Sequence, residues 1–80
     1  MKDLVSFIVA ELVEDKKGFS VSLEEGRGED GEDIVNIYVK QGDIGRVIGK
    51  DGRIAKAIRT IVRAAGTREG KRYVVEIIEK

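Results

Sequence analysis

The sequence contains neither cysteine nor histidine among its 80 residues. Without cysteine there can be no disulfide and no thiolate metal site, and without histidine the chain lacks the usual zinc ligand and the usual general base. No nucleophile stands beside a base in the remaining sequence. We therefore expect no metal, no cofactor and no enzymatic activity.

Long hydrophobic runs and proline are also absent. The most apolar segment, residues 4–13, is interrupted by Ser6 and Glu11 and is too short to span a membrane. It has no basic leader and no cleavage pattern. Because no linker, repeat or low-complexity tract appears, residues 1–80 are expected to form a single cytoplasmic domain without membrane contact.

Charge of either sign is abundant, but the two signs are separated along the chain. Residues 1–33 carry 10 acidic and 4 basic side chains, whereas residues 34–80 carry 5 acidic and 11 basic ones. The formal net charge of zero therefore conceals a negative first part and a positive second part. Such a separation draws a polyanion toward one side of a molecule, although an ordinary charged surface would also be consistent with it.

Hydrophobic periodicity predicts the first half of the fold. Apolar residues at helical spacing indicate an amphipathic helix over residues 3–16, with Asp3 as its cap. Residues 19–24 and 35–40 alternate between apolar and polar, which predicts two half-buried strands. The acidic, glycine-rich segment 26–33 between them predicts an antiparallel pair with a mobile loop.

The second half reads as two helices and a strand. A short helix capped by Asp43 should end at Gly49, and a longer one should run from Arg53 to about Ala65, closed by Gly66. We expect the apolar stripe of the longer helix at Ile54, Ala57, Ile58, Ile61 and Ala65, opposite a basic face at Arg53, Lys56, Arg59 and Arg63. A β-branched segment from residue 73 to 78 predicts a last strand.

The element order is thus α-β-β-α-α-β. A crossover through two helices most simply returns the last strand parallel to the second and beside it. We therefore predict an α+β domain with a three-stranded mixed sheet and all helices on one face.

The junction between the last two helices holds the strongest functional signal, the sequence Gly49-Lys50-Asp51-Gly52. Two glycines three positions apart let the backbone turn sharply, so that a polyanion can approach the main-chain amides. The positive end of the following helix faces the same place. Turn glycines with no ligand would give the same bare motif, so its surroundings must decide.

Those surroundings resemble a known family, the type II (prokaryotic) KH domain, whose hallmark is Val-Ile-Gly-x-x-Gly-x-x-Ile. Residues 47–54 reproduce this pattern, with Ile54 one position early and Ala55 at the last site. The resemblance covers essentially the whole chain, and residues 47–60 are particularly similar to the small stand-alone bacterial KH proteins of the KhpA family.

The resemblance implies single-stranded RNA in a narrow groove, with the glycine loop clamping the backbone of about four nucleotides. By position, the clamp would be Gly49, Lys50, Asp51 and Gly52. The floor of the groove would include Ile44, Val47, Ile48 and Ile54, which could equally be core residues, with the edge of the strand at residues 37–39 opposite. The family likeness further implies a low-specificity RNA chaperone or post-transcriptional regulator. It also implies a homodimer and a heteromer with a larger, Jag-type KH protein linked to cell elongation, shape and division.

Two departures bear on affinity. Asp51 places a carboxylate inside the clamp, so Arg46, Arg53 and Lys56 would have to supply the positive charge. The segment 26–33 would border the groove, and its four carboxylates would repel phosphates or select against duplex RNA.

Other interpretations are weaker. Residues 26–31 fit the dinucleotide-binding pattern Gly-x-Gly-x-x-Gly but lead into a predicted strand instead of a helix. Residues 45–50 are one residue short of a nucleotide P-loop, and Asp51 stands where that motif needs serine or threonine. Glu24, Glu25 and Asp43 are expected to be solvated surface, as is the far half of the basic helix face. A protein-interaction adaptor built on the same fold remains the main alternative to RNA binding.

Overall fold

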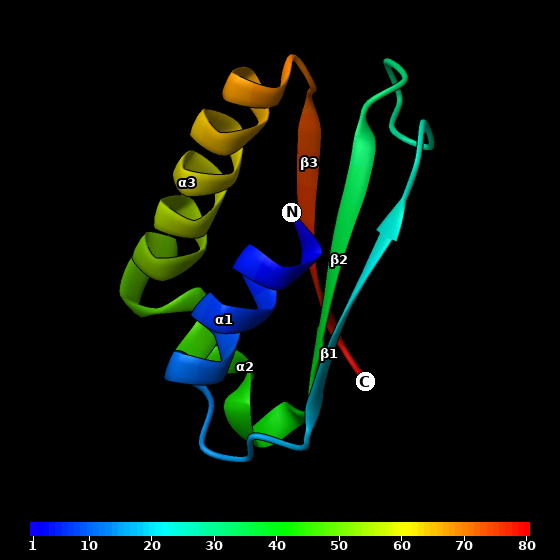
Figure 1. Cartoon of the computed structure of the whole chain (residues 1–80). Helices are drawn as coiled ribbons and strands as arrows, with labels where there is room; N and C mark the ends of the chain where they lie inside the picture. The colour runs from blue at the N-terminus through cyan, green and yellow to red at the C-terminus, as the bar shows by residue number, and fades with distance from the viewer.

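The computed structural model describes all 80 residues, and its α+β architecture has the predicted order α-β-β-α-α-β. A single 3-10 turn at Lys50–Gly52 joins the second and third helices (Figure 1). The helices and strands are α1 (Lys2–Leu12), β1 (Phe19–Glu24), β2 (Asp33–Val39), α2 (Gln41–Ile48), α3 (Arg53–Glu69) and β3 (Tyr73–Glu79).

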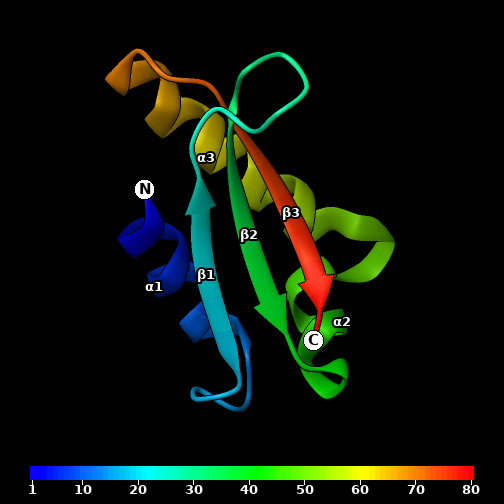
Figure 2. The same ribbon diagram turned by 90° about the vertical axis from the view of Figure 1, so that its right-hand side faces the viewer.

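The three strands form one mixed sheet in the order β1-β2-β3. β1 runs antiparallel to β2, with Val21 opposite Ile37, and β3 runs parallel to β2, with Val75 opposite Val35. All helices lie on one face of this sheet, and the other face is bare (Figures 1 and 2). The predicted crossover and its parallel last strand are therefore confirmed.

The core lies between the helices and the covered face of the sheet. Alternate residues of each strand point into it, as the period of two requires. It is built almost entirely from valine and isoleucine, namely Val5, Val9, Val13, Val21, Val35, Ile37, Val39, Val47, Ile58, Val62 and Val75. With no cavity-filling aromatic residue among these, the positions of the helices depend on close contacts between short side chains.

The first helix is shorter than predicted, and Asp43 is the reason. α1 ends at Leu12, because Val13 is extended (φ −82°, ψ 150°) and the amides of Glu14 and Asp15 donate to the Asp43 carboxylate at 3.1 and 3.2 Å. The expected cap at Asp3 is also wrong, since α1 begins after Met1 without any side-chain cap.

Asp43 therefore has a different role from both predictions made for it. It is 3% exposed, so it is not solvated surface, and it does not cap α2, which begins two residues earlier at Gln41. A carboxylate is stable in this position because its oxygens are hydrogen-bonded by two main-chain amides.

The third helix is longer than predicted. It continues through Gly66, which is buried, to Glu69, and Gly70 in the left-handed conformation ends it. Its buried stripe consists of Ala55, Ile58, Val62 and Gly66. Ile61, predicted to be buried, is 43% exposed, and Ala57 is exposed too. No helix in the structure has the length and apolar character that crossing a membrane would require.

Candidate nucleic-acid interface

The turn between α2 and α3 depends on a conformation at Gly49 that only glycine adopts readily. Gly49 has φ 76° and ψ 172°, and its amide donates to the Gly45 carbonyl at 2.8 Å. A Cβ here would lie 2.9 Å from the Cβ of Ile54 and 3.0 Å from its amide nitrogen. The absence of a side chain therefore lets the turn pack directly on the first residues of α3.

The second glycine has a different function. Gly52 is also left-handed (φ 75°, ψ 14°), but a Cβ on it would meet no atom within 4 Å. Asp51 is left-handed as well (φ 56°), and no other non-glycine residue of the chain has positive φ. Gly49, Asp51 and Gly52 thus have left-handed or glycine-only conformations, and they bring the backbone to the surface where α3 begins. The amino end of α3 is exposed next to this turn.

The polar side chains around this turn are available to a ligand. Lys50, Asp51, Arg53 and Lys56 are all exposed, and their side chains form neither an ion pair nor a hydrogen bond. Asp51 forms no ion pair with Lys50. Three free cations thus outnumber one free carboxylate at the start of α3.

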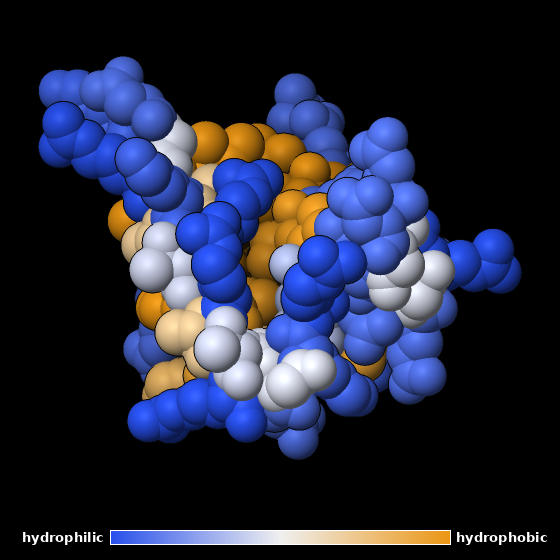
Figure 3. Space-filling view, turned by 90° about the horizontal axis from the view of Figure 1, so that it is seen from above, coloured by the Kyte–Doolittle hydropathy of each residue, from blue (hydrophilic) through white to orange (hydrophobic).

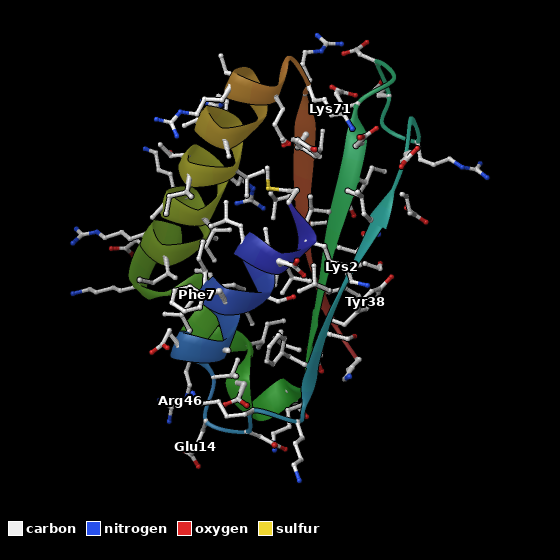
Figure 4. All side chains as sticks on the ribbon, in the orientation of Figure 1. Lys2, Phe7, Glu14, Tyr38, Arg46 and Lys71 are labelled. Carbon is white, nitrogen blue, oxygen red and sulfur yellow. The ribbon has the colours of Figure 1, made fainter.

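Arg46 is placed differently from the other predicted cations. Its guanidinium contacts the Glu14 carboxylate at 3.0 Å and the Asp43 carboxylate at 3.5 Å, below α1 (Figure 4). This arrangement holds α2 against the end of α1 and leaves Arg46 partly neutralised.

A second ion pair secures the start of α2. The ammonium of Lys40 lies 3.0 Å from the carboxylate of Asp15. The hydrogen bond from Lys40 lowers the pKa of Asp15, and the same bond raises the pKa of Lys40. The helix that leads into the glycine turn is therefore fixed at its beginning by Lys40 and along its length by Asp43 and Arg46.

The predicted apolar floor is only partly accessible. Val47 is fully buried and belongs to the core, whereas Ile44 and Ile54 are partly buried and pack against the core. Ile48, next to the glycine turn, is 37% exposed. Ile48 and the outer atoms of Ile54 are thus the apolar groups that a base could contact beside the turn.

The strand that faces the helices across the groove is β3, which corrects the sequence prediction. β2 is hydrogen-bonded to β1 on one edge and to β3 on the other, and Ile37 and Val39 are fully buried. The central strand therefore has no free edge that a ligand could contact. Figure 2 shows the glycine turn projecting beyond the β3 edge of the sheet. β3 is the edge strand on that side because the crossover places it outside β2.

Two arginines of α3 line a pocket farther along the helix. A pocket of about 180 Å³ between α3 and β3 is lined by Arg59, Arg63, Tyr73, Val74 and Val75. These arginines belong to the half of the basic face that we expected to be solvated. The parallel crossover could have indicated β3 as the groove strand, but nothing local in the sequence indicates which side of α3 faces it.

Comparison with known proteins identifies the fold and the family. The family model described as "KhpA/KhpB, KH domain" matches residues 2–77. This chain belongs to that KH-domain family. Membership in the KhpA/KhpB family agrees with the element order and with the position of the glycine turn between α2 and α3.

Individual relatives extend over the full chain. The RNA-binding protein KhpA of Clostridium perfringens is 50% identical over 78 residues, which is 98% of this chain and 100% of that protein. The RNA-binding protein KhpA of Aquifex aeolicus is 42% identical over 79 residues, covering 99% of this chain and 96% of the relative. Both names describe a binding protein, and the prediction of a non-enzymatic chain is confirmed by this family.

A more distant likeness shows the fold alone. The crystal structure of a point variant of Aquifex aeolicus Era, bound to GDP and aluminium fluoride, superimposes with a TM-score of 0.61 and 17% identity. The match covers 99% of this chain but only 29% of that protein. The KhpA/KhpB fold therefore also occurs as one part of a larger protein.

Proposed function

We propose that this protein binds single-stranded RNA by clamping its sugar-phosphate backbone at the turn formed by Gly49, Lys50, Asp51 and Gly52. The observation that carries the proposal is the left-handed or glycine-only backbone at Gly49, Asp51 and Gly52. This backbone opens toward solvent at the start of α3, among free cations. The name of the curated relatives, RNA-binding protein KhpA, supports the same ligand.

The donors for phosphate are the main-chain amides within the turn and the ammonium of Lys50. The Gly49 amide is already bonded to Gly45, and the Gly52 amide donates to the Gly49 carbonyl at 3.1 Å. The amides of Lys50 and Asp51, between the two glycines, are therefore the donors we assign to a phosphate. Arg53, the first residue of α3, and Lys56, one turn further on, add positive charge beside them.

Bases would lie in the groove between this turn and β3. Ile48 and Ile54 supply apolar contact on the helix side, and Ile77, which is half-buried on the face of β3 that the helices cover, supplies it on the strand side. Apolar contacts distinguish bases poorly, so this groove favours low sequence preference. We accordingly assign the protein a role as an RNA chaperone or post-transcriptional regulator in the cytoplasm.

Binding measured by fluorescence anisotropy with short oligoribonucleotides tests the proposal. We expect Lys50→Asp to abolish binding without loss of folding stability, because Lys50 is exposed and makes no contact. Lys17→Asp, an equal charge change at an exposed lysine after α1, is the matched control and should bind as the wild type does. Wild-type binding by the Lys50→Asp protein would refute the clamp.

A protein-interaction role is the second candidate, because apolar side chains are exposed on the helices. Phe7 is 67% exposed and points from α1 toward the side of α3 (Figure 4), where Ile61 is 43% exposed. We propose that these side chains serve self-association or pairing with a larger, Jag-type KH protein; the family model, which names both KhpA and KhpB, fits this pairing. The double variant Phe7→Gln, Ile61→Gln should lower the mass measured by light scattering while RNA binding persists. An unchanged mass would exclude this surface.

A further inference from the structure

The far end of α3 carries a second basic pocket, about 280 Å³ in volume. It lies between the last turns of α3, the start of β3 and the loop that joins β1 to β2. We call it the far pocket, and its lining residues are Glu32, Arg63, Thr67, Lys71, Arg72 and Tyr73. Seen from this end, apolar atoms occupy the centre of the molecule and hydrophilic side chains surround and cross them (Figure 3).

The charge balance of the far pocket favours an anion. Arg63 and Lys71 form no ion pair and no side-chain hydrogen bond, and Lys71 extends beside the start of β3 (Figure 4). Glu32 is the one carboxylate among the lining residues, and one of its oxygens already accepts the Asp30 amide at 2.9 Å. Three cations therefore face one carboxylate that is partly satisfied by its own loop.

Arg72 lines the far pocket and is held in place by hydrogen bonds. Its guanidinium donates to the Asp30 carbonyl at 3.0 Å, and its carbonyl accepts the Asp33 amide at 3.0 Å. These two bonds hold the β1–β2 loop beside the start of β3. One side-chain hydrogen bond thus joins the loop that we predicted to be mobile to the start of β3.

The far pocket adjoins the smaller pocket that lies beside Arg59, nearer to the glycine turn along α3. It shares Arg63 and Tyr73 with the 180 Å³ pocket between α3 and β3. Arg63 lies ten residues beyond Arg53 on the same helix, which corresponds to about 15 Å at 1.5 Å per residue. Phosphates of one strand are at least about 3.4 Å apart, so an octanucleotide is long enough to reach from the turn to the far pocket.

We propose that the far pocket binds a second backbone phosphate of the same RNA strand, through Arg63 and Lys71, so that the protein holds a strand longer than the clamp alone requires. This proposal rests on the RNA-binding function proposed above. Tyr73, whose hydroxyl donates to Glu69 at 3.2 Å and whose ring lies against Gly66, forms a firm surface shared by the far pocket and the smaller pocket beside it.

The test compares the salt dependence of binding for a four-nucleotide and an eight-nucleotide oligouridylate. The measured quantity is the slope of the logarithm of affinity against the logarithm of salt concentration. Affinity alone would mislead, because a longer strand binds more tightly merely by offering more binding registers, whereas the slope reports the number of phosphate contacts. Each added contact on a single strand steepens the log–log slope by about 0.7. We expect the wild type to show a steeper slope for the octamer than for the tetramer, by roughly 0.7 to 1.4 for one or two contacts.

The double variant Arg63→Gln, Lys71→Gln should bind the tetramer as the wild type does and lose the extra slope with the octamer. A control that removes two exposed lysines elsewhere, Lys2→Gln with Lys17→Gln, should keep it. If the wild type showed equal slopes for both lengths, the far-pocket proposal would be wrong. It would also be wrong if the control lost the octamer's extra slope as the double variant does. Neither result would contradict the clamp. Absence of binding to either length would overturn both proposals.

Discussion

At the scale of single residues, the two glycines of the turn differ in the reason why a side chain would be unfavourable. Gly49 combines a glycine-only backbone with a close approach to Ile54, whereas Gly52 needs only its positive φ. Gly52→Ala should therefore cost roughly 1 to 2 kcal/mol of unfolding free energy, the penalty of a left-handed residue. Gly49→Ala adds overpacking and should cost about 3 kcal/mol or more. Urea denaturation distinguishes these values, and equal costs would show that the contact with Ile54 relaxes freely.

The ion pair between Lys40 and Asp15 makes stability depend on pH. Because the pKa of Asp15 is lowered from 3.8, its contribution is present above that value and is lost as the pH falls through the folded-state pKa. The pKa of Lys40 is raised from 10.5, so its contribution is present below that value and is lost at higher pH. Lys40→Gln should therefore be less stable than the wild type between about pH 4 and 10. The difference should shrink below pH 4, and denaturation curves at several pH values that show a constant difference would contradict the pairing.

At the scale of elements, the third helix shows which features sequence patterns can and cannot supply. Its existence follows from the spacing of Ile54, Ile58 and the basic residues. Its true end does not, because Gly66 reads as a stop signal and lies instead under the ring of Tyr73. That contact joins a helix and a strand in space, and no local pattern contains it.

Two helical glycines provide a matched test of this interpretation. Gly45 in α2 has open space where a Cβ would lie, so Gly45→Ala should stabilise the protein by roughly 0.5 to 1 kcal/mol through helix propensity. In Gly66→Ala, the new Cβ would lie 2.8 Å from Cδ2 of Tyr73 and 2.9 Å from the Lys71 carbonyl. We expect that variant to lose about 1 kcal/mol or more. Thermal denaturation of both variants would reveal the opposite signs, and stabilisation by Gly66→Ala would show that Tyr73 is free to move.

The second helix illustrates the same limit at the candidate site. The glycine turn, Lys50 and the order of the flanking elements were predictable, because glycine spacing and helical periodicity are local. The burial of Asp43 and the ion pair between Arg46 and Glu14 could not be predicted. Both depend on contacts between the end of α1 and α2, which are about thirty residues apart in the sequence. The groove strand was misassigned for a related reason, because β2 and β3 have equally apolar sequences.

At the scale of the whole molecule, stability rests on a small valine-rich core, so neighbouring residues of α3 should differ sharply in importance. Ile58 is 2% exposed and Ile61 is 43% exposed. We expect Ile58→Ala to lower the unfolding free energy by about 2 to 5 kcal/mol, the range for truncating a buried isoleucine. Ile61→Ala should change the unfolding free energy of the monomer by no more than about 0.5 kcal/mol. Comparable losses in both variants, measured at low protein concentration, would mean that the helix is rotated from the orientation described here.

The separation of charge along the chain is only partly kept in space, because Lys40, Arg46 and Arg72 contact the acidic first part. Arg59 and Arg63 of α3 line a pocket beside β3, while four carboxylates lie in the loop between β1 and β2, at the end of the molecule away from the glycine turn (Figure 1). A strand that extended along α3 into the far pocket would lie beside this acidic loop, where Arg63 and Lys71 would offset the carboxylates. This arrangement favours a single strand, because the second strand of a duplex would add phosphates that the loop repels.

The most direct measurement is chemical-shift mapping of the backbone amides during titration with a short oligoribonucleotide. Binding at the turn predicts the largest changes at residues 49–53, with smaller ones at Lys56 and along β3, and little change on the bare face of the sheet. If the amides of residues 49–53 remained unmoved while the RNA bound, the backbone clamp would not be the RNA site of this protein.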